Sequence, residues 1–301
     1  MKVYNETMEI LKKYKIQANK SLGQNFLVDD AVINQIIETA NINKQDLIIE
    51  IGPGLGVLTN KLLEKCNNVI AIELDKKMVK ILEDRFYNNL LKYSNEDSAT
   101  NLNEIAKLEI INDDILKVDL ISLILNKKQQ KNIQNVKIVA NLPYYISTPI
   151  IMKLLEQKLQ INEIIVMVQK EVAERLTAKT GTRIGGAITY AVEYFAEATP
   201  IIKVPKEAFI PSPKVESEVI KLKVRTEPKV EVKNEKLFFD IIQKSFTQRR
   251  KTLANTLVNY NIIKSKIEVD EMFKTLDLNN NVRGENLTLE QFANITNYLS
   301  I

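Results

Sequence analysis

Four consecutive residues, Asn141-Leu142-Pro143-Tyr144, offer groups suited to chemistry on a planar amino group. The side-chain oxygen of Asn141 and the backbone carbonyl of Leu142 are hydrogen-bond acceptors, and Pro143 holds Leu142 extended while carrying no N–H of its own. The ring of Tyr144 offers a face on which a base can stack. Two acceptors on the N–H groups of an adenine favour the pyramidal nitrogen that can attack an activated methyl group. The motif therefore predicts methylation of an adenine amino group; the alternative is a strand-ending turn with a core tyrosine.

A glycine-rich segment, residues 50–56, indicates a loop that binds a cofactor. Gly52 and Gly54 let the backbone turn sharply after a strand and approach a ligand closely. Glu73 ends the next expected strand, where a carboxylate can accept both hydroxyls of a ribose. NAD-binding folds use the same two devices, but their fingerprint places its third glycine one position later, where this chain has Val57. Glu50 favours S-adenosylmethionine (AdoMet), because an acid there can hold the positively charged amino group of its methionine part.

Two shorter segments are weaker signals. Asp114, rather than Asp113, is predicted to accept the amino hydrogen of the cofactor's adenine, and the alternative is that the pair caps a helix. Residues 24–27, Gln-Asn-Phe-Leu, come before the first expected strand. By themselves they indicate only a loop leading to a helix capped by Asp29.

The elements that must position these groups alternate along the chain. Short apolar runs predict strands, and the segments between them predict helices. The strands are expected at 47–51, 69–72, 108–111, 137–140 and 163–168, and the helices at 57–65, 75–86 and 148–159. This order indicates an α/β fold with a parallel, doubly wound, Rossmann-like sheet. The expected reactive groups follow its strands at their carboxyl ends, where such sheets bind ligands.

The remaining segments divide the chain into two expected domains. Polar, Asn-rich stretches at 88–107 and 126–135 are interpreted as surface insertions, and alternation at 189–195 and 218–224 predicts an edge hairpin. A polar, proline-broken stretch at 226–234 is interpreted as a linker, after which only helical patterns occur. We therefore expect a cofactor-binding domain at 1–227 and a small all-helical domain at 234–301.

Composition excludes several kinds of chemistry. The chain has no histidine, so neither a Ser-His nucleophile nor an imidazole base can form, and with a single cysteine the usual zinc sites and an internal disulfide are unavailable. We expect no metal. The apolar runs are too short to cross a bilayer and the first 20 residues lack a signal-peptide core, so a cytoplasmic protein without a membrane partner is expected. The net charge of +4 favours a nucleic-acid partner only weakly.

Together these motifs resemble the KsgA/RsmA family of ribosomal small-subunit RNA adenine dimethyltransferases, which are class I methyltransferases with a helical C-terminal domain. The resemblance covers nearly the whole chain, apart from the two Asn-rich stretches. It is carried by segments in the family's order, at 21–27, 50–56, 73, 114, 141–144, 208–215, 246–252 and 283–286. It implies that Asn25, Leu27 and Asn141 contact AdoMet, and that Phe209 clamps the target adenine opposite Tyr144.

The resemblance also implies a substrate: two adjacent adenosines in the 3′-terminal hairpin of 16S rRNA, each dimethylated on a pre-assembled small subunit. A monomer is expected. Four basic residues, expected around the start of a helix, are candidate RNA contacts: Lys244, Arg249, Arg250 and Lys251. Six further basic residues could also contact RNA phosphates, or could simply form an ordinary charged surface: Lys203, Lys206, Lys214, Lys221, Lys223 and Arg225.

Three rival functions stay open at this point. An Erm-type enzyme would methylate one adenine of 23S rRNA, although the segments at 246–252 and 283–286 and Leu142 in place of isoleucine argue against it. A ribosome assembly factor in which binding outweighs catalysis is compatible with every motif. A NAD-linked oxidoreductase is the structural alternative and would bind NAD rather than AdoMet.

Overall fold

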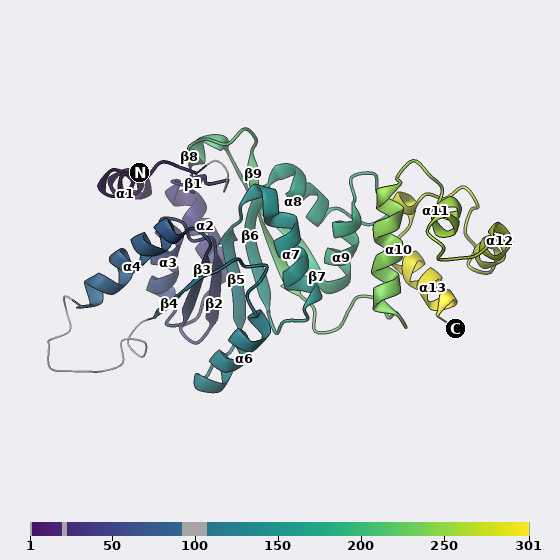
Figure 1. Ribbon diagram of the computed structural model, residues 1–301, viewed down its shortest axis with the longest axis horizontal. Helices are drawn as coiled ribbons and strands as arrows, with labels where there is room; N and C mark the ends of the chain where they lie inside the picture. Colours follow the sequence, from purple (N-terminus) through teal and green to yellow (C-terminus); the bar gives the residue numbers. More distant parts are fainter. Residues whose placement is uncertain (1, 20–22, 92–106, 301) are drawn as a thin grey trace. The chain divides into compact units, whose positions relative to one another are not determined.

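The computed structural model describes residues 2–19, 23–91 and 107–300 (Figure 1). Most of the expected insertion at 88–107 and the first two residues of the 21–27 motif therefore lie outside the described residues. The chain forms two compact units. The first, here the sheet unit, comprises Met1–Ala173 and Thr199–Val224, and the second, the helical unit, comprises Glu174–Ala198 and Arg225–Ile301. Glu174–Ala198 thus differs from the division expected at 227, because it belongs to the helical unit.

The sheet unit is built on seven strands in the order β4-β3-β2-β5-β6-β9-β7. Neighbours from β4 to β6 pair in parallel, and β6 pairs with β9 antiparallel. The strands are β2 (Leu47–Ile51), β3 (Val69–Glu73), β4 (Leu108–Asn112), β5 (Val136–Asn141), β6 (Glu163–Gln169), β7 (Ala196–Val204) and β9 (Ser217–Val224). The direction of winding reverses between β2 and β5, which is the point where doubly wound sheets bind ligands. The Rossmann-like prediction is confirmed.

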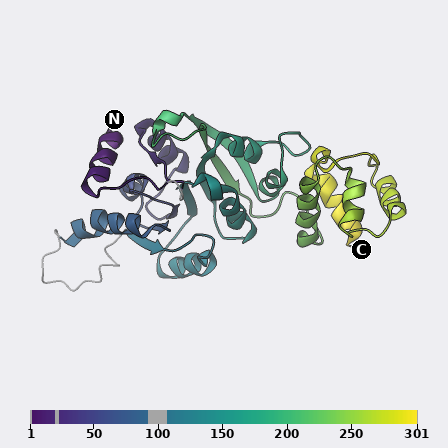
Figure 2. The same ribbon diagram turned by 45° about the horizontal axis from the view of Figure 1, so that its top comes forward.

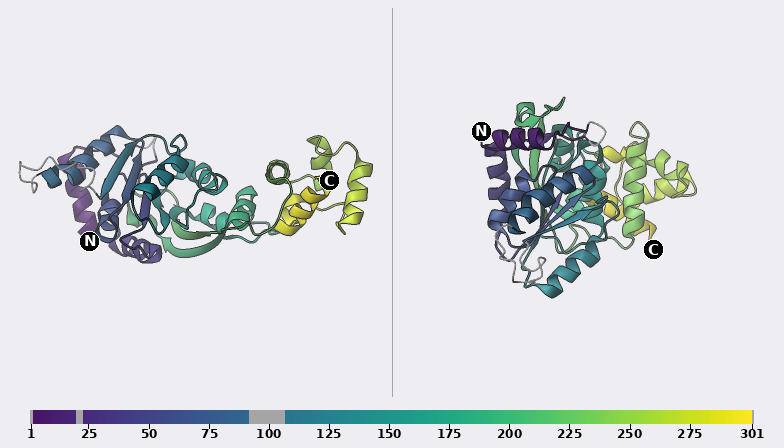
Figure 3. Two further views of the ribbon diagram at one scale, coloured as in Figure 1. Left: turned by 90° about the horizontal axis from the view of Figure 1, so that it is seen from below. Right: turned by 60° about the vertical axis from the view of Figure 1, so that its left-hand side comes forward.

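Helices cover both faces of this sheet, as Figure 3 shows. They are α1 (Lys2–Lys13), α2 (Asp30–Ala40), α3 (Val57–Lys65), α4 (Lys76–Leu91), α6 (Leu120–Gln130), α7 (Ser147–Glu156) and the first half of α8 (Lys170–Thr177). Asp29 caps α2, accepting from the N–H groups of Ala31 at 2.8 Å and Val32 at 3.2 Å. Five consecutive residues are buried in both β2 and β3, because a parallel sheet is covered on both faces.

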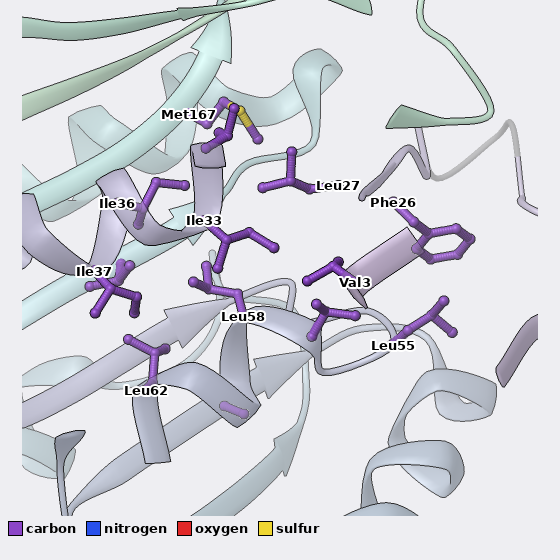
Figure 4. Close-up of a cluster of buried hydrophobic side chains, with 14 of the residues drawn as sticks. Val3, Phe26, Leu27, Ile33, Ile36, Ile37, Leu55, Leu58, Leu62 and Met167 are labelled. Carbon is purple, nitrogen blue, oxygen red and sulfur yellow. The ribbon is translucent and has the colours of Figure 1, made fainter. Parts of the chain in front are cut away.

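An apolar core connects α2 and α3 with the segment before the sheet. Figure 4 shows side chains from these elements directed into one cluster. Phe26 and Leu27 belong to β1 (Phe26–Leu27), which pairs antiparallel with β8 (Phe209–Ile210) in a separate small sheet. α1, which no sequence pattern predicted, lies beside α2 (Figure 2), where the N–H of Val3 donates to Asp30 at 3.3 Å. The N-terminal segment is therefore part of the fold rather than a loop.

The helical unit contains the second half of α8 and the helices α9 (Ala187–Phe195), α10 (Glu235–Thr247), α11 (Leu253–Asn259), α12 (Lys266–Thr275) and α13 (Leu289–Leu299). Tyr190 is fully buried and its ring contacts those of Phe246 and Phe292 at centroid distances of 5.4 and 5.2 Å. Its hydroxyl donates to the carbonyl of Leu287 at 2.5 Å. These contacts explain why α9 joins the C-terminal helices.

One predicted strand is wrong, and part of one expected insertion is helical. Residues 189–195 form helix α9 rather than a strand: their β-branched and aromatic residues favour a strand locally, but nearly all of them are buried in the helix. The backbone N–H of Gly186 donates to the hydroxyl of Thr189 at 2.9 Å and helps to fix its first turn. Residues 126–130, expected in a surface insertion, continue α6, since their Lys and Gln side chains favour helix while remaining solvated.

No helix among the described residues is long and apolar enough to span a membrane. Within the same residues, no three acidic or cysteine side chains gather as ligands for a metal ion.

Candidate active site

One pocket opens at the carboxyl ends of β2, β3 and β5, at the point where the winding reverses. It brings together all seven predicted cofactor residues, from segments far apart in the sequence: Asn25, Leu27, Gly52, Gly54, Glu73, Asp114 and Asn141. Leu142, Pro143 and Tyr144 also line it, and so do Glu50 and Asp113. The pocket is therefore lined by every residue predicted for cofactor binding and by the whole reaction motif, but not by Phe209.

The glycine loop has the backbone that the sequence requires. Gly52, Gly54 and Gly56 have φ angles of +67°, +57° and +77°, in the region where other residues are strained. A Cβ on Gly56 would also lie 2.6 Å from the side chain of Leu82 on α4. Arg85, one turn further along α4, donates to the carbonyl of Leu55 and pairs with Glu6 of α1. Helix α4 thus packs against the glycine loop through Leu82 and Arg85.

Glu73 is held in place by the loop that it faces. Its carboxylate accepts from the backbone N–H of Gly54 at 3.1 Å and from that of Asp75 at 2.8 Å. Burial raises the pKa of Glu73, although the two backbone hydrogen bonds oppose this shift. Gln24, just before β1, donates to Asp75 at 2.9 Å and so fastens the N-terminal segment to the end of β3. These hydrogen bonds fix the orientation of the Glu73 carboxylate at the pocket.

Glu50 is the most strongly perturbed acid of the pocket. Its side chain is buried, and one oxygen accepts from the hydroxyl of Thr59 at 2.6 Å. Burial raises the pKa of Glu50 from 4.5 to about 8, an effect that Thr59 opposes and the charge of Glu73 reinforces. A cation placed against this carboxyl would favour its ionised form. The fit to an ammonium group is therefore good.

The two aspartates after β4 both line the pocket and are both partly used by the backbone. Asp113 accepts from the N–H of Asp114 at 2.7 Å, and Asp114 accepts from the N–H of Leu116 at 3.0 Å with one of its two oxygens. The two aspartates stabilise a turn at 115–117 rather than cap a helix, because α6 begins only at Leu120 and its N-cap is Asp119. The bond to Leu116 uses only one of the two carboxylate oxygens of Asp114.

Asn141 has the orientation that an acceptor of an amino group needs. Its side-chain nitrogen donates to the backbone carbonyl of Asn25 at 3.3 Å, so its oxygen is turned away from that contact. Among the described residues no donor is bonded to this oxygen. The N–H of Leu142 donates to the carbonyl of Met167 on β6 at 3.2 Å, and Pro143 has φ −59° and ψ 128°. The motif is therefore anchored to the sheet while its acceptors remain available.

The two aromatic residues predicted to bind the target base lie in different places. Tyr144 lines the pocket, and its hydroxyl lies 2.6 Å from that of Ser217. Phe209 is buried in the core of the sheet unit, only 3% exposed, and pairs with Leu27 between β8 and β1. It does not line the pocket. As a second wall for the target base, Phe209 remains a proposal.

The four basic residues predicted to bind RNA do not form one open cluster. Lys244 pairs with Asp240 at 2.6 Å, and Arg249 pairs with Glu285 at 3.4 Å and donates to the carbonyl of Gly185. Arg250 and Lys251 are exposed. Residues 249–251 precede α11 instead of starting a helix, because Thr252 is its N-cap and the first helical residue is Leu253. Of the scattered lysines, Lys221 pairs with Glu163 at 2.7 Å.

Several functional contacts had no signal in the sequence. Thr59 bonds Glu50 across nine positions, Gln24 bonds Asp75, and Ser217 bonds Tyr144, and none of these pairs has a short spacing or a motif that would reveal it. Helix caps, such as Asp29 on α2 and Thr288 on α13, do follow local rules that a sequence can show.

The fold and the pocket define an AdoMet-dependent methyltransferase of the Rossmann-like class: a doubly wound sheet, a strained glycine loop, two buried carboxylates and an amide acceptor meet at its switch point. The family model described as ribosomal RNA adenine dimethylase matches residues 15–300. The chain belongs to this family.

Similar proteins agree with this assignment. Ribosomal RNA small subunit methyltransferase A of Alkaliphilus metalliredigens is 43% identical over 292 residues, covering 97% of this chain and 95% of that protein. The protein of the same name from Clostridioides difficile is 41% identical over 297 residues, covering 99% and 96%. Among solved structures, a dimethyladenosine transferase from Plasmodium falciparum has a TM-score of 0.70 at 25% identity, covering 92% of this chain and 98% of that one. The 23S rRNA methyltransferase ErmE shares the fold, with a TM-score of 0.63 at 21% identity over 92% of this chain and 100% of that one.

Proposed function

We propose that this protein transfers methyl groups from AdoMet to the exocyclic amino nitrogens of two adjacent adenosines in the 3′-terminal hairpin of 16S rRNA. Each adenosine would receive two methyl groups. The observation that carries the chemistry is the orientation of Asn141, whose nitrogen is bonded to Asn25 and whose oxygen is left to accept an N–H. The choice of RNA is supported by the relatives named for the small subunit, at 41–43% identity. ErmE is a match at 21% identity, so its own substrate does not carry over.

The residues of the pocket suit each part of AdoMet. Glu50 would hold the ammonium group, Glu73 the ribose hydroxyls, and the second oxygen of Asp114 the adenine amino group. The bound cofactor supplies a methyl group on a positively charged sulfur. The strained backbone of the loop at Gly52 and Gly54 allows a close approach that side chains would block.

The chain's own contribution to the reaction is to bind and orient the target base. The oxygen of Asn141 and the carbonyl of Leu142 would accept hydrogen bonds from the two N–H groups of the amino group. These bonds would favour a pyramidal nitrogen, whose lone pair is less conjugated with the ring and can attack the methyl group. Tyr144 would stack on the base once it is flipped out of the RNA. Because hydrogen bonds alone perform this activation, the absence of histidine is no obstacle.

The direct test is nucleoside mass spectrometry of small subunits from a strain that lacks the methylation, incubated with this protein and AdoMet. Dimethyladenosine should appear in 16S rRNA, at two adjacent positions. Dimethyladenosine confined to 23S rRNA, or macrolide resistance in a sensitive host that expresses the protein, would instead support an Erm-type function. We expect the protein to act as a monomer in the cytoplasm.

The affinity for AdoMet should depend on pH through Glu50. With a pKa of about 8, this carboxyl must lose a proton to pair with the ammonium group, so the affinity should rise by nearly tenfold per pH unit from about pH 6 to about 8. Above about pH 8 the amino group of AdoMet loses its own proton and the affinity should fall again. Isothermal titration across this range measures the effect. Glu50→Gln should weaken binding and flatten the rise, and an equally steep rise in this variant would contradict the assignment.

The stability of the protein without AdoMet should show the opposite trend. The pKa of Glu50 is about 8 in the folded state and near 4.5 when unfolded, so unfolding releases a proton between these values. Its burial therefore lowers the free energy of unfolding progressively as the pH rises through that window. Urea unfolding of the wild type and of Glu50→Gln at pH 5 and pH 8 separates this contribution.

Arg250 and Lys251 are proposed to contact RNA phosphates. Replacing both by Ala should weaken binding to small subunits and lower the slope of log affinity against log salt by about one for each phosphate that the side chains neutralise. The affinity for AdoMet should not change. Arg249→Ala is the matched comparison: because Arg249 pairs with Glu285 and binds Gly185, its removal should lower the stability of the helical unit. An unchanged salt slope in the Arg250 and Lys251 double variant would remove these residues from the RNA interface.

A further inference from the structure

A buried serine lies behind the aromatic wall of the pocket. Ser217 begins β9 and is fully buried, and its hydroxyl lies 2.6 Å from the hydroxyl of Tyr144. β9 pairs antiparallel with β6, with Ser217 opposite Gln169, and β6 pairs in parallel with β5, which ends at Asn141. A contact between separate strands therefore fixes the far end of a side chain that belongs to the reaction motif.

Tyr144 is restrained at both ends by this contact and by its backbone. Its carbonyl accepts from the hydroxyl of Ser147 at 3.2 Å, at the start of α7. At the other end, the bond to Ser217 fixes the position of the phenol oxygen and so the direction in which the ring points. A phenol oxygen forms hydrogen bonds preferentially near the plane of its ring, whichever hydroxyl donates, so a bond to one buried partner restrains rotation of the ring as well.

The neighbouring tyrosine provides the contrast. Tyr145 also lines the pocket but is 57% exposed, and its ring rests against Gly23. No hydrogen bond to its hydroxyl occurs among the described residues. Of these two rings at the pocket, the one in the reaction motif is therefore the one whose hydroxyl is tied to a buried strand residue.

We propose that Ser217 is a positioning residue for methyl transfer: its hydroxyl holds the ring of Tyr144 in the orientation on which the target base stacks. This inference rests on the proposed function, since it assigns the ring to the base. Because the ring of Tyr144 is already oriented before the base binds, no conformational entropy is lost in orienting it during the reaction. Loss of the hydrogen bond should therefore lower turnover rather than AdoMet binding. Ser217 does not touch the reacting atoms and acts only through Tyr144.

The test compares Ser217→Ala, Tyr144→Phe and the double variant, using full-length protein and small subunits from an unmethylated strain. Each single change removes the same hydrogen bond, so each should lower kcat by about three- to tenfold. The KM and Kd for AdoMet should stay within about twofold of wild type. In the double variant kcat should be no lower than in the singles, because the bond can be removed only once. Ser217→Cys, which keeps a weak hydrogen-bonding group of similar size, should be intermediate.

Ser245→Ala is the matched control. Ser245 is also a buried serine, bonded to the carbonyl of Ile241 in its own helix at 2.7 Å, and its replacement should leave kcat unchanged. An unchanged kcat in Ser217→Ala, or effects that multiply in the double variant, would overturn the proposal. If Ser217→Ala does not fold, Tyr144→Phe and Ser217→Cys test the same bond. The methylation rate of the wild type on small subunits tests the proposed substrate. The ratio of variant to wild-type kcat tests the role of Ser217, and it can be measured on whichever ribosomal RNA is methylated.

Discussion

Replacing Asn141 by Ala should lower the rate of methyl transfer by about two to three orders of magnitude, the effect typical when an oriented polar group that acts in the transition state is removed. The reason lies in the bond from its side-chain nitrogen to the carbonyl of Asn25. That bond fixes the amide, and we propose that its oxygen then accepts from the amino group of the base. The affinity for AdoMet should change by only a few-fold, because at most one neutral hydrogen bond to the cofactor is removed. Single-turnover methylation and isothermal titration measure the two effects separately.

Asn60→Ala serves as the matched control, because Asn60 lies on α3 and does not line the pocket. It should leave the rate unchanged. Asn141→Ala should still bind small subunits, which separates catalysis from a role in assembly. Near-normal methylation by Asn141→Ala would contradict the mechanism. Normal ribosome maturation in cells that carry this variant, but not in cells that lack the gene, would show that binding is the main role.

Replacing Lys137 by Met should lower the free energy of unfolding by about 3–5 kcal/mol, the typical cost of leaving one partner of a buried ion pair alone. Lys137 is 5% exposed, and its ammonium group lies 2.8 Å from the buried carboxylate of Asp46. The ammonium group also donates to the carbonyls of Ala40 and Asn41 at the end of α2, at 2.9 and 2.8 Å. The pair thus joins the start of β2, strand β5 and helix α2. Urea unfolding measures the decrease.

The control is Lys127→Met, which removes the partly exposed pair with Glu109 and should cost about 1 kcal/mol or less. Converting both buried partners, in Lys137→Met with Asp46→Leu, should cost less than Lys137→Met alone, because no unpaired charge remains. Burial by itself would raise the pKa of Asp46, but hydrogen bonds from Lys137, Asn43 and Asn135 together hold it below the ordinary value of 3.8. This contribution is complete above about pH 4 and disappears as the pH falls below that value. Equal decreases in the two single-lysine variants would refute the role given to the buried pair.

Local sequence rules predicted most elements of the sheet unit. The apolar strands, the glycine loop and the motif at 141–144 are each consecutive in the sequence, and the alternating order of strands and helices predicts which strand ends meet. The motifs and the resemblance together named seven residues for the cofactor, and all seven line one pocket. The interpretation of 189–195 as a strand failed because its β-branched and aromatic residues favour a strand locally, whereas in the fold nearly all of them are buried in helix α9.

Local rules could not predict which side chains contact each other. Arg249 and Lys244 belong to a basic stretch that predicts RNA binding, yet Arg249 binds Gly185 and Glu285, and Lys244 binds Asp240. Arg249, Arg250 and Lys251 are all exposed, but the guanidinium of Arg249 is already paired with Glu285. The buried Phe209 differs from its expected place for the same kind of reason, because the pairing of β8 with β1 turns it into the core.

The sequence by itself determined the class of fold, the order of the motifs and the residue types that bind a cofactor and accept an amino group, because each of these depends on neighbours along the chain. Only the tertiary structure decided how these groups are oriented and charged. Asn25 turns the amide of Asn141, Ser217 holds Tyr144, and burial beside Thr59 gives Glu50 its raised pKa. The physical reason is that orientation and burial arise from contacts between distant segments, which no local pattern encodes.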